Sequence, residues 1–379
     1  MLAHFSWIKK LDWILISSAL VLSFLGFATI KSFGGSDYFF NRQIIWLLAA
    51  LLVFILTCRV DWSFLKTNSI FLLVLYLFLI LLLVVTAIVG ETTRGAASWI
   101  KIHSVTLEPV ELIKPILVLL LAKYFSKRHV DIARFLHLFI SSLYAGLPFL
   151  LVLVQPDFGS AAVLGAIWLG MALFSGVKLR HFLILMAIGL IVLSLAWSSF
   201  LLPYQKTRVL AFLNPQKDIQ GAGYQAYQSM IAVGSGQIFG KGIGLGTQSR
   251  LEFLPEHATD FIFAAFAEEW GFLGMIIFFI FWGILLWRVI RFGIYAESNF
   301  EKLYAAGLAI FLFFQSSIHI GMNVGLLPIT GLGMPFMSYG GSSLVSLFFA
   351  LGILESFSLH KKGIFIGGEE RFKEGVLGA

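Results

Sequence analysis

Apolar runs separated by short polar segments dominate the chain. They cover residues 13–30, 44–58, 70–89, 112–125, 136–154, 158–174, 182–202, 261–287, 303–326 and 344–359. Because a helix needs about 20 mostly apolar residues to cross a bilayer, we interpret each run as one transmembrane helix. The pattern predicts an all-α polytopic integral membrane protein in which residues 1–360 form a ten-helix transmembrane domain and residues 361–379 a short cytoplasmic tail.

The composition supports this class. Hydrophobic residues make up 59% of the 379 residues and charged residues only 12%, more apolar surface than a soluble domain of this size needs. The net charge of +7 would suggest nucleic acid in a soluble protein, but the basic residues lie in short segments between apolar runs. We therefore expect them to set the orientation in the membrane, and we expect no nucleic-acid partner. Cys58 is the single cysteine, which excludes an intramolecular disulfide and a Cys-based metal site.

The distribution of Lys and Arg predicts the orientation. Most of these residues lie in the N-terminal segment, in the tail, and in the connections after the second, fourth, sixth and eighth runs. Because cytoplasmic segments are enriched in Lys and Arg, both termini are predicted to be cytoplasmic. The long polar segment 203–260, between helices 7 and 8, is then an extracytoplasmic loop.

Asp260 stands where this long loop meets the eighth apolar run. A carboxylate at full membrane depth costs roughly 2.5–3.5 kcal/mol on insertion scales, so a functional role is one interpretation. The other is that Asp260 caps the helix that follows, since Asp is a preferred N-cap residue and suits the positive end of the helix dipole. The residue type alone leaves both interpretations open.

Further charges enter the apolar zone on the same predicted side. Glu108 precedes the fourth run, and Glu111 and Lys114 follow at a spacing that puts them on one helix face. Asp157 lies between the fifth and sixth runs. A Lys within a short membrane helix needs a counter-charge, and Asp157 and Glu111 are the candidates. We expect Lys114 and Asp157 to form a structural ion pair that can also rigidify a cavity beside Asp260.

Glycines recur in the long loop between positions 234 and 246. A nucleotide-binding P-loop is excluded, because Ser235 stands where the first Gly of that motif belongs and Gly242 where its Ser or Thr belongs. Two interpretations remain. The segment is either a flexible or tightly turning loop, or a surface for an anion built from Lys241 and backbone N–H groups.

Small residues share one face of the eighth run. At steps of three or four they are Asp260, Ala264, Ala267, Gly271 and Gly274. Such a stripe allows close helix packing, and the alternative is a groove for a lipid chain. Glu268 and Glu269, two turns into the run, are either a second acid or structural hydrogen-bonding groups.

The ninth run contains His319 and leads into an uncharged connection rich in Gly, Pro and Ser. Uncharged irregular backbone at a membrane edge suggests a re-entrant or tightly packed segment. A lone histidine such as His319 is more often a hydrogen-bonded core residue than a metal ligand. The spacing of His, Cys and carboxylates predicts no tight metal site.

Several long motifs resemble the SEDS family of shape, elongation, division and sporulation proteins. They are Gly-Ala-Gly-Tyr-Gln at 221–225, Gln-Ser-Met-Ile-Ala-Val-Gly-Ser-Gly at 228–236, Phe-Leu-Pro-Glu at 253–256, Thr-Asp-Phe-Ile-Phe-Ala at 259–264, Gly-Met-Asn-Val-Gly-Leu-Leu-Pro-Ile-Thr-Gly at 321–331 and Pro-Phe-Met-Ser-Tyr-Gly-Gly-Ser-Ser at 335–343. The short chain and the segment 246–256 are more similar to RodA, the elongation member, than to FtsW, the division member.

The resemblance implies a peptidoglycan glycosyltransferase that polymerises lipid II at the outer face of the bacterial cytoplasmic membrane. It implies a role in cell elongation and shape, with a class B penicillin-binding protein as partner. The essential acid of the family falls on Asp260, its charged pair falls on Lys114 and Asp157, and the Glu of the same motif falls on Glu111.

The sequence departs from the family pattern at two places. Glu108 stands where the family usually has Gln or a similar residue, which adds negative charge at the rim of the expected cavity. The family usually has His directly before Thr-Asp, whereas here Ala258 holds that position and His257 stands one residue earlier. A family role for that His is therefore in doubt.

Glycan extension from a polyprenyl-diphosphate sugar requires a sugar hydroxyl to attack an anomeric carbon. Asp260 is the predicted general base, a role worth roughly 10²- to 10⁴-fold in rate. The leaving diphosphate needs cations or N–H donors, and Arg208, Lys241, Lys114 and a divalent cation, Mg²⁺ or Mn²⁺, are the candidates. A single displacement inverts the anomeric centre.

Two other functions remain open. A flippase for the lipid-linked precursor would also carry a buried Lys–Asp pair, but no internal repeat of the transporter kind is found, and the polar groups gather at one membrane face. A scaffold for a penicillin-binding protein is the second, because the helices offer a large lateral surface to a single-span partner.

Overall fold

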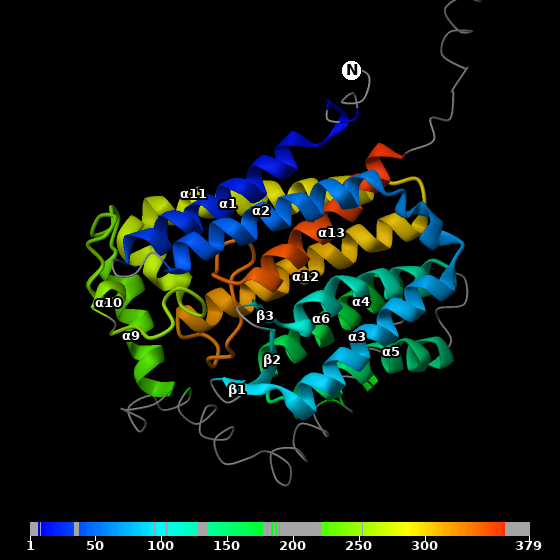
Figure 1. Ribbon diagram of the computed structural model, residues 1–379, viewed down its shortest axis with the longest axis horizontal. Helices are drawn as coiled ribbons and strands as arrows, with labels where there is room; N and C mark the ends of the chain where they lie inside the picture. Colours follow the sequence, from blue (N-terminus) through cyan, green and yellow to red (C-terminus); the bar gives the residue numbers. More distant parts are fainter. Residues whose placement is uncertain are drawn as a thin grey trace, which may run out of the picture.

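The structure is a computed structural model of the chain. It describes residues 9–33, 38–93, 96–102, 105–127, 135–176, 222–251 and 253–360, with Trp7 and a few isolated positions between 177 and 212. Most of these residues form a bundle of long helices, which Figure 1 shows running side by side. The helices are α1 (Trp13–Ser32), α2 (Tyr38–Arg59), the short 3-10 helix η2 (Trp62–Lys66), α3 (Ser69–Val89), α4 (Pro109–Ser126), α5 (Phe135–Val154), α6 (Phe158–Phe174), α9 (Ala222–Ser235), α10 (Thr247–Arg250), α11 (Ile262–Ile294), α12 (Asn299–Asn323) and α13 (Gly341–Leu359).

Each predicted apolar run within the described residues overlaps one helix of the bundle. Seven of the described helices are long and apolar enough to cross a membrane: α1, α2, α3, α5, α11, α12 and α13. The remaining two that match a predicted run are α4, of 18 residues, and α6, of 17 residues. The predicted seventh run, 182–202, lies almost entirely outside the described residues.

Helix α12 is the centre of the bundle. It packs against α4, α6, α9, α11 and α13, while α1 packs against α11 and α2 against α13 (Figure 1). The interior is built from Phe, Leu, Ile and small residues. Polar side chains on the buried face of α12 therefore reach segments from several distant parts of the sequence.

A small antiparallel sheet connects α3 to α4, so the prediction of an all-α protein is wrong for this segment. Its strands, in spatial order, are β1 (Glu91–Thr93), β2 (Ala96–Ile102) and β3 (Val105–Leu107). Ile100 lies opposite Leu107, and Ile102 lies opposite Val105. Residues of this kind favour strands. The segment is too short to cross a membrane, so a search for apolar runs passes over it.

The long loop also contains regular structure, with α9 and α10 inside it. The eighth predicted run is not one straight helix. Gly271 has φ 63° and ψ −164°, values that only glycine adopts readily, and they break α11 after its first two turns. The rings of Phe263 and Phe278 are 5.8 Å apart, although fifteen residues of straight helix span about 22 Å. The two arms of α11 therefore fold back on each other at Gly271.

Candidate active site

A cavity of about 290 Å³ opens at the end of the bundle where α2, α4, α6 and α13 begin. Residues from five separate stretches of the sequence line it, at 39–46, 99–111, 160, 256–260 and 331–343, and these include β2, β3 and the connection between α12 and α13. Its polar and charged lining residues are Arg42, Lys101, Thr106, Glu108, Glu111, Ser160, Glu256, Thr259, Asp260, Ser338, Tyr339, Ser342 and Ser343. The cavity therefore collects the charged residues that the sequence placed at the ends of different apolar runs.

Asp260 lines this cavity and is only 8% exposed. The N-cap position of α11 is held by Phe261, whose side chain makes no cap hydrogen bond, so the helix begins one residue too late for Asp260 to be its cap. The Asp260 backbone is fixed instead. Its N–H donates to the Glu256 carbonyl at 3.1 Å, and its carbonyl accepts from Asn323 Nδ2 at 3.0 Å. Between the two interpretations from the sequence, the geometry favours function.

Lys114 is fully buried in α4, and its partner differs from the predicted one. Its Nζ atom lies 2.5 Å from Glu111 Oε1 and 3.2 Å from Gln315 Oε1. Among the described residues Lys114 makes no direct ion pair with Asp157, although the two side chains interact electrostatically. Asp157 instead caps α6, where its Oδ1 accepts from the Ser160 N–H at 3.0 Å. Glu111, one turn from Lys114 on the same helix, supplies the counter-charge.

Carboxyl groups gather around this pair. The second oxygen of Glu111, Oε2, is buried without a hydrogen-bond partner, and Glu111 lines the cavity. Glu108 precedes α4, makes no side-chain cap hydrogen bond, and lies close to Glu111, Asp157 and Asp260. Burial, followed by repulsion from these neighbouring carboxylates, raises the pKa of Glu108 well above its usual value. Burial also raises the pKa of Asp157. The carboxyl groups at the cavity are therefore crowded, and the crowding favours the neutral form of Glu108.

Arg42 and Lys101 are the basic residues among those that line the cavity, and neither was a sequence candidate. Arg42 lies in the first turn of α2, and Lys101 lies on β2 of the unexpected sheet. Arg42 falls just before the second apolar run, and Lys101 falls in the segment between the third and fourth runs, both on the predicted outer side. Their position on the same predicted side of the membrane as Asp260 could have marked them as candidates. No motif or spacing in the sequence connects either residue to Asp260.

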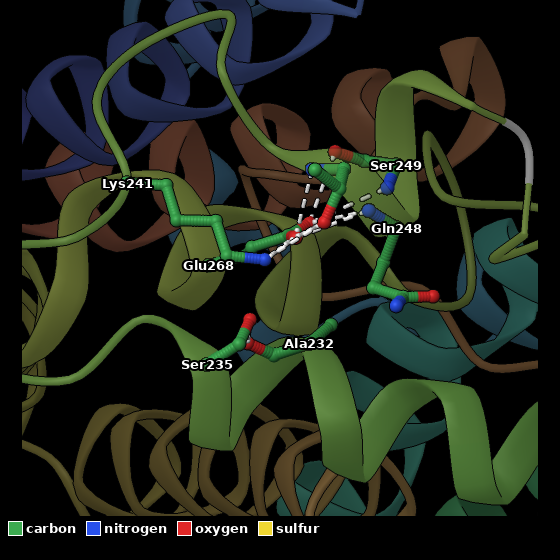
Figure 2. A network of polar contacts seen from close by, with 7 residues as sticks. Ala232, Ser235, Lys241, Gln248, Ser249 and Glu268 are labelled. Carbon is green, nitrogen blue, oxygen red and sulfur yellow. Dashed lines mark hydrogen bonds and ion pairs between the residues drawn. The ribbon is translucent and has the colours of Figure 1, made fainter.

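The glycine-rich loop binds the carboxylate of Glu268, a residue of the same chain. Glu268 Oε1 accepts from Lys241 Nζ at 2.7 Å, from the Thr247 N–H at 2.9 Å and from the Gln248 N–H at 3.0 Å, and Oε2 accepts from the Ser249 N–H at 3.3 Å. Figure 2 shows Lys241, Gln248 and Ser249 converging on this carboxylate. Lys241 does not line the cavity, so its predicted role as a substrate cation has no support in the geometry.

Glu269 is also structural, with Ser32 Oγ donating to its Oε2 at 2.6 Å and the Gly244 N–H donating to its Oε1 at 3.2 Å. The small stripe of the eighth run serves close packing. A Cβ on Gly236 would lie 2.0 Å from the Ala267 carbonyl oxygen, and one on Gly240 would lie 2.1 Å from that of Glu269. The loop therefore lies directly on the first arm of α11.

Two predicted candidates remain. Arg208 lies outside the described residues. His257 bonds the Leu254 carbonyl through Nδ1 at 3.0 Å and packs against Phe33, and it is not among the cavity-lining residues, which agrees with the doubt about a family role. Within the described part of the chain, no three His, Cys, Asp or Glu side chains are grouped to hold a metal ion.

Comparison with known proteins supplies the family. The family model described as cell cycle protein, which covers FtsW, RodA and SpoVE, matches residues 4–363. Stage V sporulation protein E of Bacillus subtilis is 34% identical, with 93% of this chain and 98% of that protein covered. The peptidoglycan glycosyltransferase MrdB of Escherichia coli K12 is 36% identical, with 76% of this chain and 78% of that protein covered.

Solved structures agree with the sequence relatives. A chain from a peptidoglycan synthase complex that coordinates polymerisation and crosslinking aligns with a TM-score of 0.79 and 30% identity, over 93% of this chain and 99% of that one. The crystal structure of the rod shape determining protein RodA of Thermus thermophilus aligns with a TM-score of 0.69 and 27% identity, over 92% and 96%. With a family model over nearly its whole length and relatives above 30% identity, this chain belongs to the FtsW/RodA/SpoVE family.

Proposed function

We propose that the protein is a peptidoglycan glycosyltransferase that polymerises lipid II by inverting transfer, with Asp260 as general base. The observation that carries the proposal is the position of Asp260, a nearly buried carboxylate in a cavity that collects charged residues from distant segments. The relatives named peptidoglycan glycosyltransferase support the reaction class. A cavity-lining carboxyl with a perturbed pKa, here Glu108, is typical of sites that move protons.

In the proposed reaction, Asp260 takes the proton of the attacking sugar hydroxyl. The hydroxyl oxygen forms a bond to the anomeric carbon of the donor, and the bond from that carbon to the diphosphate oxygen breaks. The electron pair leaves with the diphosphate. A single displacement from the opposite side turns an α-linked donor into a β-linked chain, and a positioned base contributes roughly 10²- to 10⁴-fold to the rate.

The leaving diphosphate carries several negative charges, and Arg42 and Lys101 are the cavity residues that can balance them. Glu111 has one oxygen without a partner, and that oxygen can accept a hydrogen bond from a sugar hydroxyl or amide. We therefore assign Arg42 and Lys101 to the diphosphate and Glu111 to the sugar. Lys114 holds Glu111 in place from inside the helix bundle.

We also propose that a divalent cation assists the reaction, although none of the steps above depends on it. The described residues offer no group of three ligands, whereas Mg²⁺ is commonly held by one or two carboxylates together with substrate phosphates. Of the lining carboxylates, Asp260 and Glu108 are the candidates to share such an ion with the diphosphate. The ion would supply positive charge to the leaving group.

The chain crosses the bacterial cytoplasmic membrane ten times, counting residues 182–202, with both termini in the cytoplasm. It acts in elongation with a class B penicillin-binding protein, an assignment supported by the alignment to RodA and to a chain of a peptidoglycan synthase complex.

The test is polymerisation of labelled lipid II by purified protein in lipid, comparing wild type with Asp260→Asn. We expect polymer from wild type and a loss of at least 10²-fold in the variant. Asp61→Asn is the matched control, since Asp61 follows α2 at the end remote from the cavity and caps η2 through the Ser63 N–H. A folded Asp260→Asn protein with normal turnover contradicts the proposal. Absence of polymer from wild type as well, with partner and metal present, would favour a flippase or a scaffold.

A further inference from the structure

Three polar residues follow one another at one-turn intervals on the buried face of α12: Gln315, His319 and Asn323. They are 1%, 0% and 0% exposed. Buried polar groups are costly unless hydrogen-bonded, particularly in a helix that crosses a membrane. Each of the three bonds a backbone carbonyl in a segment outside α12, and Asn323 Nδ2 also donates to the His319 carbonyl within α12 at 2.8 Å.

Two of these carbonyls belong to the turn that follows α12. Gln315 Nε2 donates to the Gly333 carbonyl at 3.1 Å, and His319 Nδ1 bonds the Leu332 carbonyl at 2.7 Å. Because a carbonyl only accepts, His319 carries its proton on Nδ1, and its Nε2 is buried without a partner. Leu332 and Gly333 both line the cavity.

The third carbonyl is that of Asp260. Asn323 Nδ2 donates to it at 3.0 Å, and Asn323 Oδ1 accepts from the Ala264 N–H at 3.1 Å. The Asn323 side-chain amide is thus hydrogen-bonded both to the backbone of Asp260 and to the first turn of α11. The Asn323 backbone carbonyl also accepts from Ser229 Oγ of α9 at 2.8 Å. A carboxamide is needed here, because one side chain must donate and accept at the same time.

These bonds fix two neighbouring parts of the cavity wall. Asp260 Oδ2 lies 3.8 Å from the position that a Cβ on Gly331 would occupy, so the turn held by Gln315 and His319 faces the carboxylate. The same helix therefore sets the backbone of Asp260 and the wall beside it. Gln315 also accepts from Lys114 Nζ at 3.2 Å, which extends the arrangement to α4.

We propose that Gln315, His319 and Asn323 are positioning residues that hold Asp260 and the 331–333 turn at the separation the transfer reaction needs. The inference rests on the proposed function of Asp260. Misplacement of a reacting group by about 1 Å can cost 10²-fold in rate. Loss of the Asn323 contact therefore reduces turnover rather than substrate binding, since Arg42 and Lys101 stay in place.

The experiment compares Asn323→Ala with Ser316→Ala in steady-state polymerisation of lipid II by purified protein in lipid. Ser316 lies on the same helix, and its buried hydroxyl has no hydrogen-bond partner, so its removal controls for a change in α12 itself. We expect Asn323→Ala to lower kcat roughly 10- to 100-fold with KM within about threefold, and Ser316→Ala to change neither. A normal kcat, or a loss that matches the loss of folded protein, overturns the inference.

Two further variants keep the test decisive. If Asn323→Ala does not fold, Gln315→Met removes the Gly333 contact about two turns away, with an expected severalfold loss of kcat at unchanged KM. An unchanged kcat in that variant overturns the inference. Asp260→Asn is measured in parallel. If it retains activity, the proposed function fails; if it is inactive while Asn323→Ala is normal, only the positioning inference fails.

Discussion

Lys114 Nζ lies 2.5 Å from Glu111 Oε1, one turn earlier on α4, and both residues are buried. The ion pair is therefore local to one helix, although the positive charge also reaches α12 through Gln315. It places a fully desolvated ammonium group behind a carboxylate that faces the cavity. Removal of either member leaves the other buried without its hydrogen-bonded counter-charge.

Lys114→Met and Glu111→Gln are each expected to destabilise the protein by about 3–5 kcal/mol, because an uncompensated buried charge remains. The double variant is expected to lose clearly less than the sum, since it buries no charge at this position. Unfolding by SDS in mixed micelles measures all three. Additive losses would show that the two groups are not coupled.

Glu108→Gln is expected to stabilise the protein at pH 8. Burial raises the pKa of Glu108 well above its ordinary value of 4.5, so the folded protein retains a proton that the unfolded chain releases. Stability therefore falls as pH rises above about 4.5 in the wild type, and the variant lacks this loss. We expect a thermal midpoint roughly 2–4 °C higher at pH 8, with no difference at pH 4.

The control is Glu297→Gln, the same change at an exposed residue between α11 and α12. It should leave the midpoint unchanged at both pH values. A Glu108→Gln protein that is less stable than wild type at pH 8 would mean that ionised Glu108 has a stabilising partner.

Gly271→Ala is expected to detach the glycine-rich loop from α11. The break at Gly271 leaves backbone groups of α11 without partners inside the helix, and the loop bonds them instead. The Phe272 N–H donates to the Gln237 backbone carbonyl at 2.9 Å, and the Glu268 backbone carbonyl accepts from the Lys241 N–H at 2.9 Å. A Cβ at 271 would lie 2.1 Å from the Gly240 nitrogen, in a conformation that costs about 1–3 kcal/mol for other residues. Trypsin should cleave after Lys241 roughly tenfold faster.

Gly283→Ala is the matched control within the same helix. Nothing lies within 4 Å of a Cβ at that position, so this variant should resist trypsin as the wild type does. Equal cleavage of both variants would show that the loop does not depend on the break in α11.

Glu268→Gln and Lys241→Met separate the structural role of Lys241 from its predicted role in binding. The Gln side chain presents donors to backbone N–H groups, so hydrogen exchange at residues 247–249 should accelerate by at least tenfold. In Lys241→Met the carboxylate keeps its three backbone donors, and we expect a smaller acceleration with KM for lipid II within twofold. A large rise in KM for Lys241→Met would restore Lys241 as a substrate ligand.

Removal of divalent cations by EDTA is expected to lower polymerisation, and Mg²⁺ or Mn²⁺ is expected to restore it, while the thermal midpoint of the protein alone stays unchanged. The reason is that the described residues form no three-ligand group, so an ion would be held jointly with the substrate diphosphate. A fall in the midpoint with EDTA in the absence of lipid II would indicate a resident metal instead.

Local patterns in the sequence were enough for the helices and for several members of the site. The apolar runs gave the described membrane helices, because crossing a bilayer imposes a length and a composition that are visible residue by residue. The spacing of Glu111 and Lys114 predicted one helix face, and the structure places them together. Asp260 was identifiable because a carboxylate beside an apolar run is costly wherever the chain folds.

Only the tertiary structure decided which groups meet. It paired Lys114 directly with Glu111 and not with Asp157. It also placed the Glu268 carboxylate against the glycine-rich loop, and it brought Arg42 and Lys101 to the cavity. It also broke α11 at Gly271, a glycine that the sequence suggested only as part of a packing stripe. Each outcome depends on contacts between segments far apart in the chain. Periodicity and residue type constrain neighbours within a few turns, whereas these distances are set by how the helices pack around α12.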